Sequence, residues 1–332
     1  MIGRMKHRRF TALNRDVSEM GLGCWQIGGN WGEVTDETAL DVLVAAREGG
    51  VDFFDTADVY GDGRSEKLIG RFLRERDANV TVATKLGRRG DPTDPATVSY
   101  ERLAAYTERS LANLGVGAID LTQLHCIDTD LLRDGGCFDA LRRLRDAGKI
   151  KAFGASVESV EQAMICLRHD DLASLQIIFN VFRQKVIQPL FDMAEEQGVA
   201  LIVRLPLASG LLAGKFEKGT TFRDEDHRHF NRDGAAFNVG ETFAGLPFEK
   251  GVELAEAAWP HLRTEGASMA QAALRWVLDH DAVTTVIAGA SRPDQVRDNA
   301  AASDLPSLTD AQHAALHGLY RDEVHAHIRG PY

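Results

Sequence analysis

The sequence lacks the features that mark disulfide-stabilised, membrane-spanning and nucleic-acid-binding proteins. It has four cysteines among 332 residues, none in a C-x-x-C pair, which argues against a disulfide framework and favours a reducing cytoplasm. No apolar run approaches the ~20 residues of a membrane-spanning helix, and residues 1–15 lack the apolar segment of a signal peptide. The net charge of −11 argues against a basic surface for nucleic acid. We therefore expect a cytoplasmic protein that binds neither membranes nor nucleic acids.

The composition, with 44% hydrophobic and 26% charged residues, is typical of a folded globular protein. Short apolar runs alternate with segments of helical periodicity, which predicts parallel strands joined by helical crossovers. Eight repeats favour closure, so we expect one domain, residues 1–332, with a (β/α)8 TIM-barrel fold. Strands are predicted at residues 22–26, 51–55, 80–84, 119–125, 150–156, 174–179, 199–204 and 284–288, and helices at 37–47, 65–73, 97–114, 138–147, 159–167, 189–197, 269–278 and 293–301.

Three segments depart from this alternation. Residues 8–20 are polar and predict a β-hairpin across one end of the barrel. Residues 219–247 have no apolar periodicity and predict a long loop, which we interpret as a lid because long loops in compact domains are usually functional or disordered. Residues 309–327 predict an additional C-terminal helix, with Leu316, Leu319 and Tyr320 on its buried side.

Polar side chains of complementary chemistry follow three of the predicted strands. Asp55 ends the strand at residues 51–55, and Tyr60 lies in the polar loop after it. Lys85 directly follows the strand at residues 80–84, and His125 ends the strand at residues 119–125. Because the carboxyl ends of parallel strands meet at one rim of a barrel, we expect these four side chains to converge there.

The four residues lie in the segments DTADVYG, ATKLG and LTQLH, and together they resemble the catalytic tetrad of the aldo-keto reductases. Taken singly, each has an ordinary interpretation as a turn residue, a solvated lysine or a core histidine. The joint pattern is far more specific, and the resemblance covers nearly the whole chain. It implies an NADP(H)-dependent oxidoreductase that interconverts an aldehyde or ketone with an alcohol, with a small carbonyl compound or sugar as substrate.

The tetrad residues suit the proton transfer that carbonyl reduction requires. Tyr60 can donate the proton, but the reference pKa of tyrosine, about 10, is poorly matched to neutral pH. We expect the Lys85 ammonium to lower that pKa and Asp55 to keep Lys85 charged. His125 would orient the substrate and donate a hydrogen bond to the developing oxyanion.

A nicotinamide cofactor would bind without a Rossmann fingerprint, since the run at residues 61–66 lacks the last glycine of G-x-G-x-x-G. The resemblance implies a cofactor extended across the barrel rim. Residues 156 and 176 would hold the nicotinamide carboxamide, residues 207–215 the pyrophosphate and residues 289–299 the adenosine end. The cofactor-binding residues that it implies are Cys24, Trp25, Asp55, Ser156, Gln176, Arg204, Pro206, Leu207, Ser209, Leu211, Lys215, Gly289, Ser291, Arg292, Gln295, Asp298 and Asn299.

Three positions depart from the family pattern. Val157 stands where many members carry an Asn that binds the nicotinamide amide. Arg204 stands where an aromatic ring often stacks on the nicotinamide, and a guanidinium can stack there or bind a substrate carboxylate or cofactor phosphate. Gly289 replaces a phosphate-binding Lys of some members, so NAD(H) stays open beside NADP(H), which Arg292 favours through pairing with a 2′-phosphate.

Other charged and aromatic residues have simpler interpretations. The run DEDHRH at residues 224–229 resembles a set of metal ligands, but in a polar loop we expect it to be solvated or part of the lid, and we predict no metal site. The arginine pairs at residues 8–9 and 88–89 are interpreted as solvated surface clusters. Trp25 and Trp31 suggest an aromatic wall for the substrate.

Two alternative functions stay open. Related barrels oxidise sugars to lactones, so one alternative is an NAD(P)-dependent aldose 1-dehydrogenase. Potassium-channel β subunits share the fold and bind NADP(H), so the other is a non-catalytic regulatory subunit. The resemblance implies Asn at the position of His125 in those subunits, and the histidine here favours turnover. The sequence does not specify the oligomeric state.

Overall fold

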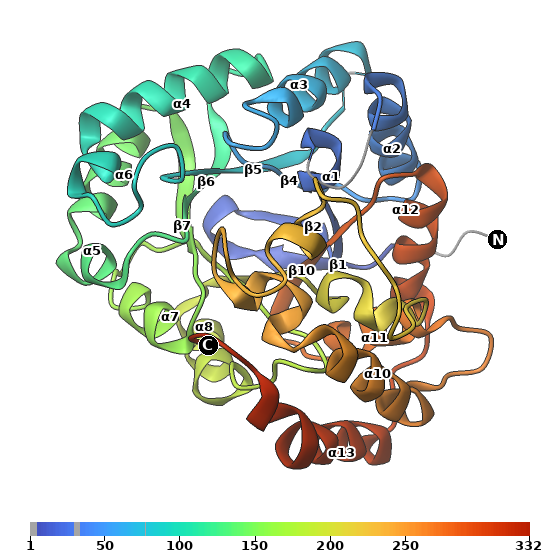
Figure 1. Ribbon diagram of the computed structural model, residues 1–332. Coiled ribbons are helices and arrows are strands. Elements are labelled where there is room, and N and C mark those ends of the chain that lie inside the picture. The colour runs from blue at the N-terminus through green and yellow to red at the C-terminus, as the bar shows by residue number, and fades with distance from the viewer. Residues whose placement is uncertain (1–4, 30–33, 77) are drawn as a thin grey trace.

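The computed structural model describes residues 5–29, 34–76 and 78–332. Within these residues, eight parallel strands form a closed barrel that the helices surround (Figure 1). The strands are β3 (Met20–Gly23), β4 (Phe53–Asp55), β5 (Thr81–Leu86), β6 (Ile119–His125), β7 (Ile150–Ser156), β8 (Ser174–Ile178), β9 (Ala200–Arg204) and β10 (Val283–Gly289). They follow one another around the barrel, and β10 pairs with β3. The predicted (β/α)8 TIM barrel is confirmed.

Helices cover the outside of the barrel, and their ends follow local sequence signals. The Ser99 side chain accepts a hydrogen bond from Arg102 N at the start of one helix, and Gly115, with φ +68°, ends the same helix in a left-handed conformation. The α-helices of the described residues are α1 (Trp25–Gly28), α2 (Asp36–Glu48), α3 (Arg64–Arg76), α4 (Tyr100–Leu114), α5 (Thr129–Asp134), α6 (Gly136–Asp146), α7 (Val160–Cys166), α8 (Asp192–Gln197), α9 (His227–Phe230), α10 (Phe248–Leu262), α11 (Met269–Leu278), α12 (Pro293–Ala300) and α13 (Asp310–Leu319). None of these is long and apolar enough to cross a membrane.

An N-terminal hairpin closes one end of the barrel, as predicted. Strands β1 (His7–Phe10) and β2 (Arg15–Ser18) pair antiparallel and lie across the ring of strands in Figure 1. Phe10 and Val17 are fully buried, and the Phe10 ring stacks on Phe53 at a centroid distance of 6.3 Å. We predicted that residues 8 and 9 form a solvated surface cluster. This prediction is wrong for Arg8, which pairs with buried Glu19 at 2.9 Å, whereas Arg9 is exposed.

The strand register brings the predicted site residues to the opposite rim. Asp55 aligns with Gly23, which aligns with Gly289. On the other side of the barrel, Ser156 aligns with both His125 and Gln176. Polar residues at the ends of neighbouring strands therefore surround one opening, as expected for the active-site rim of this fold.

The loop and the helices near the C-terminus differ in part from the prediction. Residues 219–247 are not featureless, because they contain α9 and two short 3-10 turns, η5 (Val239–Glu241) and η6 (Phe243–Gly245). Helix α10 was not predicted, and the first strand, predicted at residues 22–26, begins two residues earlier and ends at Gly23, because residues 25–28 form α1 instead. The additional C-terminal helix is confirmed, and α13 lies outside α10 (Figure 1).

Candidate active site

Lys85 is a buried cation at the carboxyl end of β5. Its side chain is 1% exposed, and Nζ donates hydrogen bonds to the Asp55 carboxylate and to the Thr56 carbonyl, the latter at 2.8 Å. Nζ also lies 3.4 Å from the Tyr60 hydroxyl. Burial alone would lower the pKa of Lys85, but Asp55 and Tyr60 outweigh burial and raise it. Lys85 is therefore a charged ammonium within reach of the phenol.

The second carboxylate oxygen of Asp55 lies next to the side-chain amides of two glutamines. Gln176 Nε2 donates to Asp55 Oδ2 at 2.7 Å, and Gln123 Nε2 lies at 3.5 Å from the same oxygen. Ser156 Oγ in turn lies 3.5 Å from Gln176 Oε1. Of the two residues predicted for the nicotinamide carboxamide, Gln176 is thus hydrogen-bonded to Asp55 directly and Ser156 is connected to it through Gln176, so a bound amide would share Gln176 with Asp55.

Tyr60 is on the loop after β4, and its ring lies between the rings of two other residues. Its ring stacks on Trp25 at 5.8 Å and meets the His125 ring edge-on at 5.9 Å. Burial raises the pKa of the Tyr60 hydroxyl, and Lys85 lowers it by a smaller amount. Lys85 therefore acts in the predicted direction, but burial outweighs it, and the pKa of Tyr60 lies above its usual value instead of below it. Trp31, the other predicted wall residue, lies outside the described residues.

His125 is a neutral imidazole at the inner end of the site. Burial lowers its pKa well below the usual value, and the nearby cations Arg88, Lys85 and Arg204 lower it further. At neutral pH it can therefore donate one hydrogen bond to a substrate oxygen but cannot act as a strong acid.

A cavity of about 320 Å³ opens at this rim, a size within the usual range for small-molecule sites. Tyr60 and His125 lie on its wall, together with most of the predicted cofactor residues: Cys24, Trp25, Asp55, Ser156, Gln176, Arg204, Pro206, Leu207, Ser209, Lys215, Gly289, Ser291 and Gln295. The structure does not place Leu211, Arg292, Asp298 or Asn299 on this wall. Leu211 is 1% exposed and packs against Gly251, so its side chain belongs to the core.

Backbone strain marks the cavity wall after β9. Leu205, Ala208 and Ser209 have positive φ angles of 53°, 48° and 56°, which non-glycine residues rarely adopt. The Ser209 hydroxyl accepts a hydrogen bond from Phe243 N at 3.1 Å and lies 3.4 Å from the Glu241 carbonyl. The side chain predicted to line the pyrophosphate therefore also holds the lid.

Arg204 and Glu241 form a charged part of the wall that joins the barrel to the lid. Arg204 Nη1 lies 3.5 Å from Glu241 Oε1, and Arg204 Nη2 donates to the Val157 carbonyl at 3.1 Å. Arg88 Nη2 binds Glu241 Oε1 at 2.7 Å, so the interpretation of residues 88–89 as a solvated cluster is wrong. The sequence analysis missed Glu241, because the loop around it carries no motif that distinguishes it from a solvated acid.

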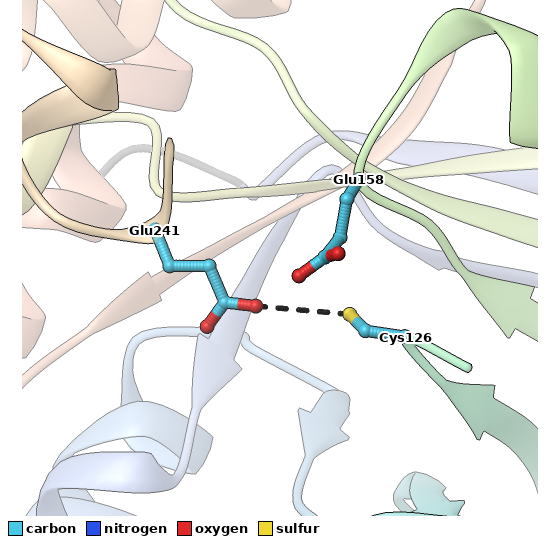
Figure 2. A group of neighbouring side chains, drawn as sticks. All are labelled: Cys126, Glu158 and Glu241. Carbon is cyan, nitrogen blue, oxygen red and sulfur yellow. Dashed lines mark hydrogen bonds between the residues drawn. The ribbon is translucent and has the colours of Figure 1, made fainter. Parts of the chain in front are cut away.

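One group of side chains in the described residues has the spacing of metal ligands, and it is not the run at residues 224–229. Cys126, Glu158 and Glu241 bring their ligand atoms within 4.8 Å of one another, and Figure 2 shows the Cys126 thiol hydrogen-bonded to Glu241 with Glu158 beside them. Burial and Glu241 raise the pKa of Glu158. Arg88 and Arg204 already bind the Glu241 carboxylate, so a cation would have to displace two guanidinium groups.

We expect Glu241→Gln to lower the stability of the protein in a pH-dependent way. Burial would raise the pKa of Glu241, but Arg88 and Arg204 outweigh it and lower the pKa from 4.5 to about 2. Ionised Glu241 therefore stabilises the fold above about pH 4.5, and this contribution is lost as pH falls toward about 2. In urea unfolding, the free energy of unfolding of the variant should be about 3 kcal/mol lower than that of wild type at about pH 7. At about pH 3 the difference should shrink to about 1 kcal/mol.

Exposed Glu253, which pairs with Lys218 at the surface, provides the control for that experiment. Glu253→Gln should leave the free energy of unfolding close to that of wild type at both pH values. A Glu241→Gln difference that stays constant between the two pH values would contradict the assigned ionisation of Glu241.

The predicted run of metal-like residues belongs to the lid instead. His227 is fully buried, its ring lies 4.9 Å from the Trp25 ring, and its Nδ1 lies 3.4 Å from Asp226. His229 and Asp224 form an exposed pair at 3.5 Å. Helix α9 therefore packs a histidine onto the aromatic wall of the cavity.

The predicted adenosine end lies where β10 leads into α12. Gln295 Oε1 accepts hydrogen bonds from Ser291 N at 2.9 Å and from Arg292 N at 3.2 Å, which caps the helix start. The Arg292 side chain is 57% exposed and pairs with Asp294. Asn299 lines a separate small cavity between α12 and the strands β3 and β10. A phosphate at this helix start would therefore compete with Gln295 for the same backbone donors.

Buried polar atoms on the cavity wall indicate that the site suits a polar ligand. In the part of the chain that the structure describes, Gln26 Oε1, His125 Nδ1 and Arg204 Nε are buried without a hydrogen-bond partner. All three residues line the cavity, some beside the tetrad and one toward the end predicted for adenosine. Because buried polar groups are normally paired, these atoms fit an extended ligand with several hydrogen-bonding groups.

Comparison with known proteins identifies the family. The model of the aldo/keto reductase family matches residues 19–321. The chain belongs to the aldo/keto reductase family. The family prediction made from DTADVYG, ATKLG and LTQLH is therefore confirmed.

Individual relatives of this aldo-keto reductase differ in what their names describe. The aldo-keto reductase YhdN of Bacillus subtilis is 29% identical, with 88% of this chain and 87% of that protein covered. A probable voltage-gated potassium channel subunit beta of Arabidopsis thaliana is 27% identical, with 92% and 93% covered. The solved glycerol dehydrogenase AKR11B4 of Gluconobacter oxydans is 30% identical, with a TM-score of 0.76 and 98% and 97% of the two chains covered.

Proposed function

We propose that this aldo-keto reductase interconverts a small polar aldehyde or ketone with the corresponding alcohol, using NADP(H). The observation that carries the proposal is the Tyr60 hydroxyl, 3.4 Å from the Lys85 ammonium and on the wall of the cavity beside His125. A phenol next to a buried ammonium can donate a proton and leave a stabilised phenolate. These are the groups that a carbonyl oxygen needs as it becomes an alkoxide.

Each tetrad residue has a separate part in the reduction. Tyr60 donates its proton to the substrate oxygen, and Lys85 stabilises the phenolate that remains. Asp55 holds the ammonium in place, and neutral His125 donates a hydrogen bond to the same substrate oxygen. When bound, the nicotinamide cofactor supplies the hydride to the carbonyl carbon or accepts it from the alcohol.

The cofactor would be held along the cavity from β8 to α12. Ser156 and Gln176 would bind the nicotinamide amide, and Gly289 and Ser291 would bring backbone close to a phosphate at the start of α12. Lys215 and Arg292 are exposed cations near the outer end, where Arg292 can pair with the 2′-phosphate that distinguishes NADP(H) from NAD(H).

The cavity wall favours a neutral, hydroxylated substrate. Trp25 provides an aromatic surface, and Glu241 provides a fixed carboxylate that can accept hydrogen bonds from hydroxyl groups. Arg204 already pairs with Glu241, so it is poorly placed to bind a substrate carboxylate. The likeness to a glycerol dehydrogenase supports this substrate class.

The proposal is tested by a binding titration followed by turnover. Quenching of protein fluorescence should show tighter binding of NADPH than of NADH, and Arg292→Gln should reduce that preference. A panel of simple aldehydes, hydroxyketones and aldoses should then contain substrates that oxidise NADPH. NADPH binding without turnover of any of them would overturn the proposal and support the regulatory-subunit alternative. Oxidation of aldoses with no measurable carbonyl reduction would instead support the aldose dehydrogenase.

A further inference from the structure

Arg89 connects the strand that carries Lys85 to the loop that carries Tyr60. It follows Lys85 by four positions, and its guanidinium turns back to the loop after β4. Arg89 Nε lies 2.9 Å from Asp58 Oδ2, and Nη2 donates to the Asp58 carbonyl. Asp58 N also donates to the Lys85 carbonyl at 3.2 Å. One stretch of chain therefore presents an ammonium to the Tyr60 hydroxyl and a guanidinium to the loop that holds it.

The same guanidinium reaches the other side of Tyr60. Arg89 Nη1 donates to Asp62 Oδ1 at 2.7 Å, so it binds the loop two residues before and two residues after Tyr60. Asp62 has a positive φ of 53° between two glycines with φ of 59° and 88°. Asp adopts this left-handed conformation more readily than most non-glycine residues, and the contact with Arg89 holds it there. Arg109 on α4 supplies an outer contact, 2.8 Å from the Asp62 carbonyl.

The buried position of Asp58 does not favour its ionised form, so the Asp58 carboxylate adds little to the stability of the fold. Its side chain is only 1% exposed, and Arg89 is its sole ion-pair partner among residues 5–29, 34–76 and 78–332. Burial raises the pKa of Asp58 to about 7, opposed by Arg89 and Arg109 and reinforced by Glu66 on α3. The folded state therefore disfavours ionised Asp58, and a neutral residue of the same shape would be at least as stable above that pH.

We propose that the Arg89–Asp58 pair, called the clamp from here on, positions Tyr60 and holds its hydroxyl within hydrogen-bond range of Lys85. Neither residue lines the cavity, so both act through Tyr60 and not on the substrate. This inference rests on the proposed role of Tyr60 as the proton donor. Loss of the ion pair lets the loop move, and a displacement on the order of 1 Å at a reacting group can cost about 10²-fold in rate.

The test uses Asp58→Asn in the full chain, because this change removes the charge and keeps the shape. We expect kcat to fall about 10- to 100-fold while NADPH affinity and KM change little. Arg89→Lys, which keeps a cation, should retain more activity than Arg89→Gln. The matched control is Arg321→Gln, which removes an exposed arginine that pairs with Asp322 near the C-terminus and does not contact the Tyr60 loop, so it should keep kcat within about threefold.

Two further measurements distinguish a loss of Tyr60 positioning from a general loss of folded structure. In wild type, kcat should fall as pH drops through about 7 because protonated Asp58 releases Arg89, and Asp58→Asn should lack this acid limb. In a Tyr60→Phe background, Asp58→Asn should cause no further loss, since both changes remove the same contribution. Unchanged kcat and pH profile in Asp58→Asn, or a full additional loss in the double variant, would overturn the proposal.

An activity-free measurement keeps this inference distinct from the proposed function. The ultraviolet difference between wild type and Tyr60→Phe during alkaline titration isolates the ionisation of Tyr60. Asp58→Asn should raise the pKa of Tyr60, because the phenol moves away from the Lys85 ammonium. A raised pKa in a protein without turnover would support the clamp and count only against the enzyme function. An unchanged pKa would count against the clamp whether or not the protein turns over carbonyl compounds.

Discussion

Tyr60→Phe is expected to lower kcat for carbonyl reduction by about 10²- to 10⁴-fold, the usual contribution of a positioned general acid. The variant removes the hydroxyl that lies 3.4 Å from Lys85 and keeps the ring that packs between Trp25 and His125. NADPH affinity should therefore stay close to that of wild type. Steady-state kinetics and a fluorescence titration of the same preparation measure both quantities.

The matched control for this variant is another buried tyrosine that is distant from the cavity. Tyr320 lies after α13 and hydrogen-bonds to Tyr332, so Tyr320→Phe removes a phenol without touching the tetrad. It should leave kcat within about twofold of wild type. Equal activity of Tyr60→Phe and wild type would remove Tyr60 from the mechanism.

Lys85→Met should have the second large effect, on both stability and turnover. It leaves the Asp55 carboxylate buried without its cation, and breaking a buried pair in this way typically costs about 3–5 kcal/mol. The phenolate of Tyr60 also loses its stabilising charge, so kcat should fall by about 10²-fold or more. Urea unfolding and single-turnover kinetics would measure the two losses separately.

A double variant distinguishes the two roles of Lys85. Asp55→Asn combined with Lys85→Met removes both charges, so it should recover about 2 kcal/mol or more of the stability that Lys85→Met alone loses. It should recover no turnover, because the ammonium next to Tyr60 is still absent. Recovery of turnover in the double variant would mean that Lys85 serves the fold and not the proton transfer.

The barrel and the tetrad could be predicted from the sequence because their signals are local. Each strand is a short apolar run, and Asp55, Lys85 and His125 stand at or next to the ends of such runs. The topology of a parallel barrel then brings strand ends to one rim without any knowledge of side-chain packing. The hairpin over the other end was predictable for the same reason, as a polar segment before the first repeat.

The charged residues of the lid and the clamp could not be predicted in this way. Arg88 and Glu241 are 153 positions apart, and nothing near either residue distinguishes a buried ion pair from two solvated charges. Arg89 was misjudged for the same reason, although it lies next to a tetrad residue. Helix α10 was missed because Gly251 and Pro260 interrupt its helical pattern, while tertiary packing against α13 and α11 stabilises it.

Transfer of deuterium from the nicotinamide ring to the product gives the clearest decision on how this protein works. NADPH carrying deuterium at the transferable position of the ring would be incubated with wild-type protein and a reducible carbonyl compound, and the alcohol analysed by mass spectrometry. We predict one deuterium on the carbinol carbon of the product, formed rapidly by wild type and at least about 10²-fold more slowly by Tyr60→Phe. NADPH that binds but never transfers its label, or transfer at the same rate without the Tyr60 hydroxyl, would contradict the proposed reaction.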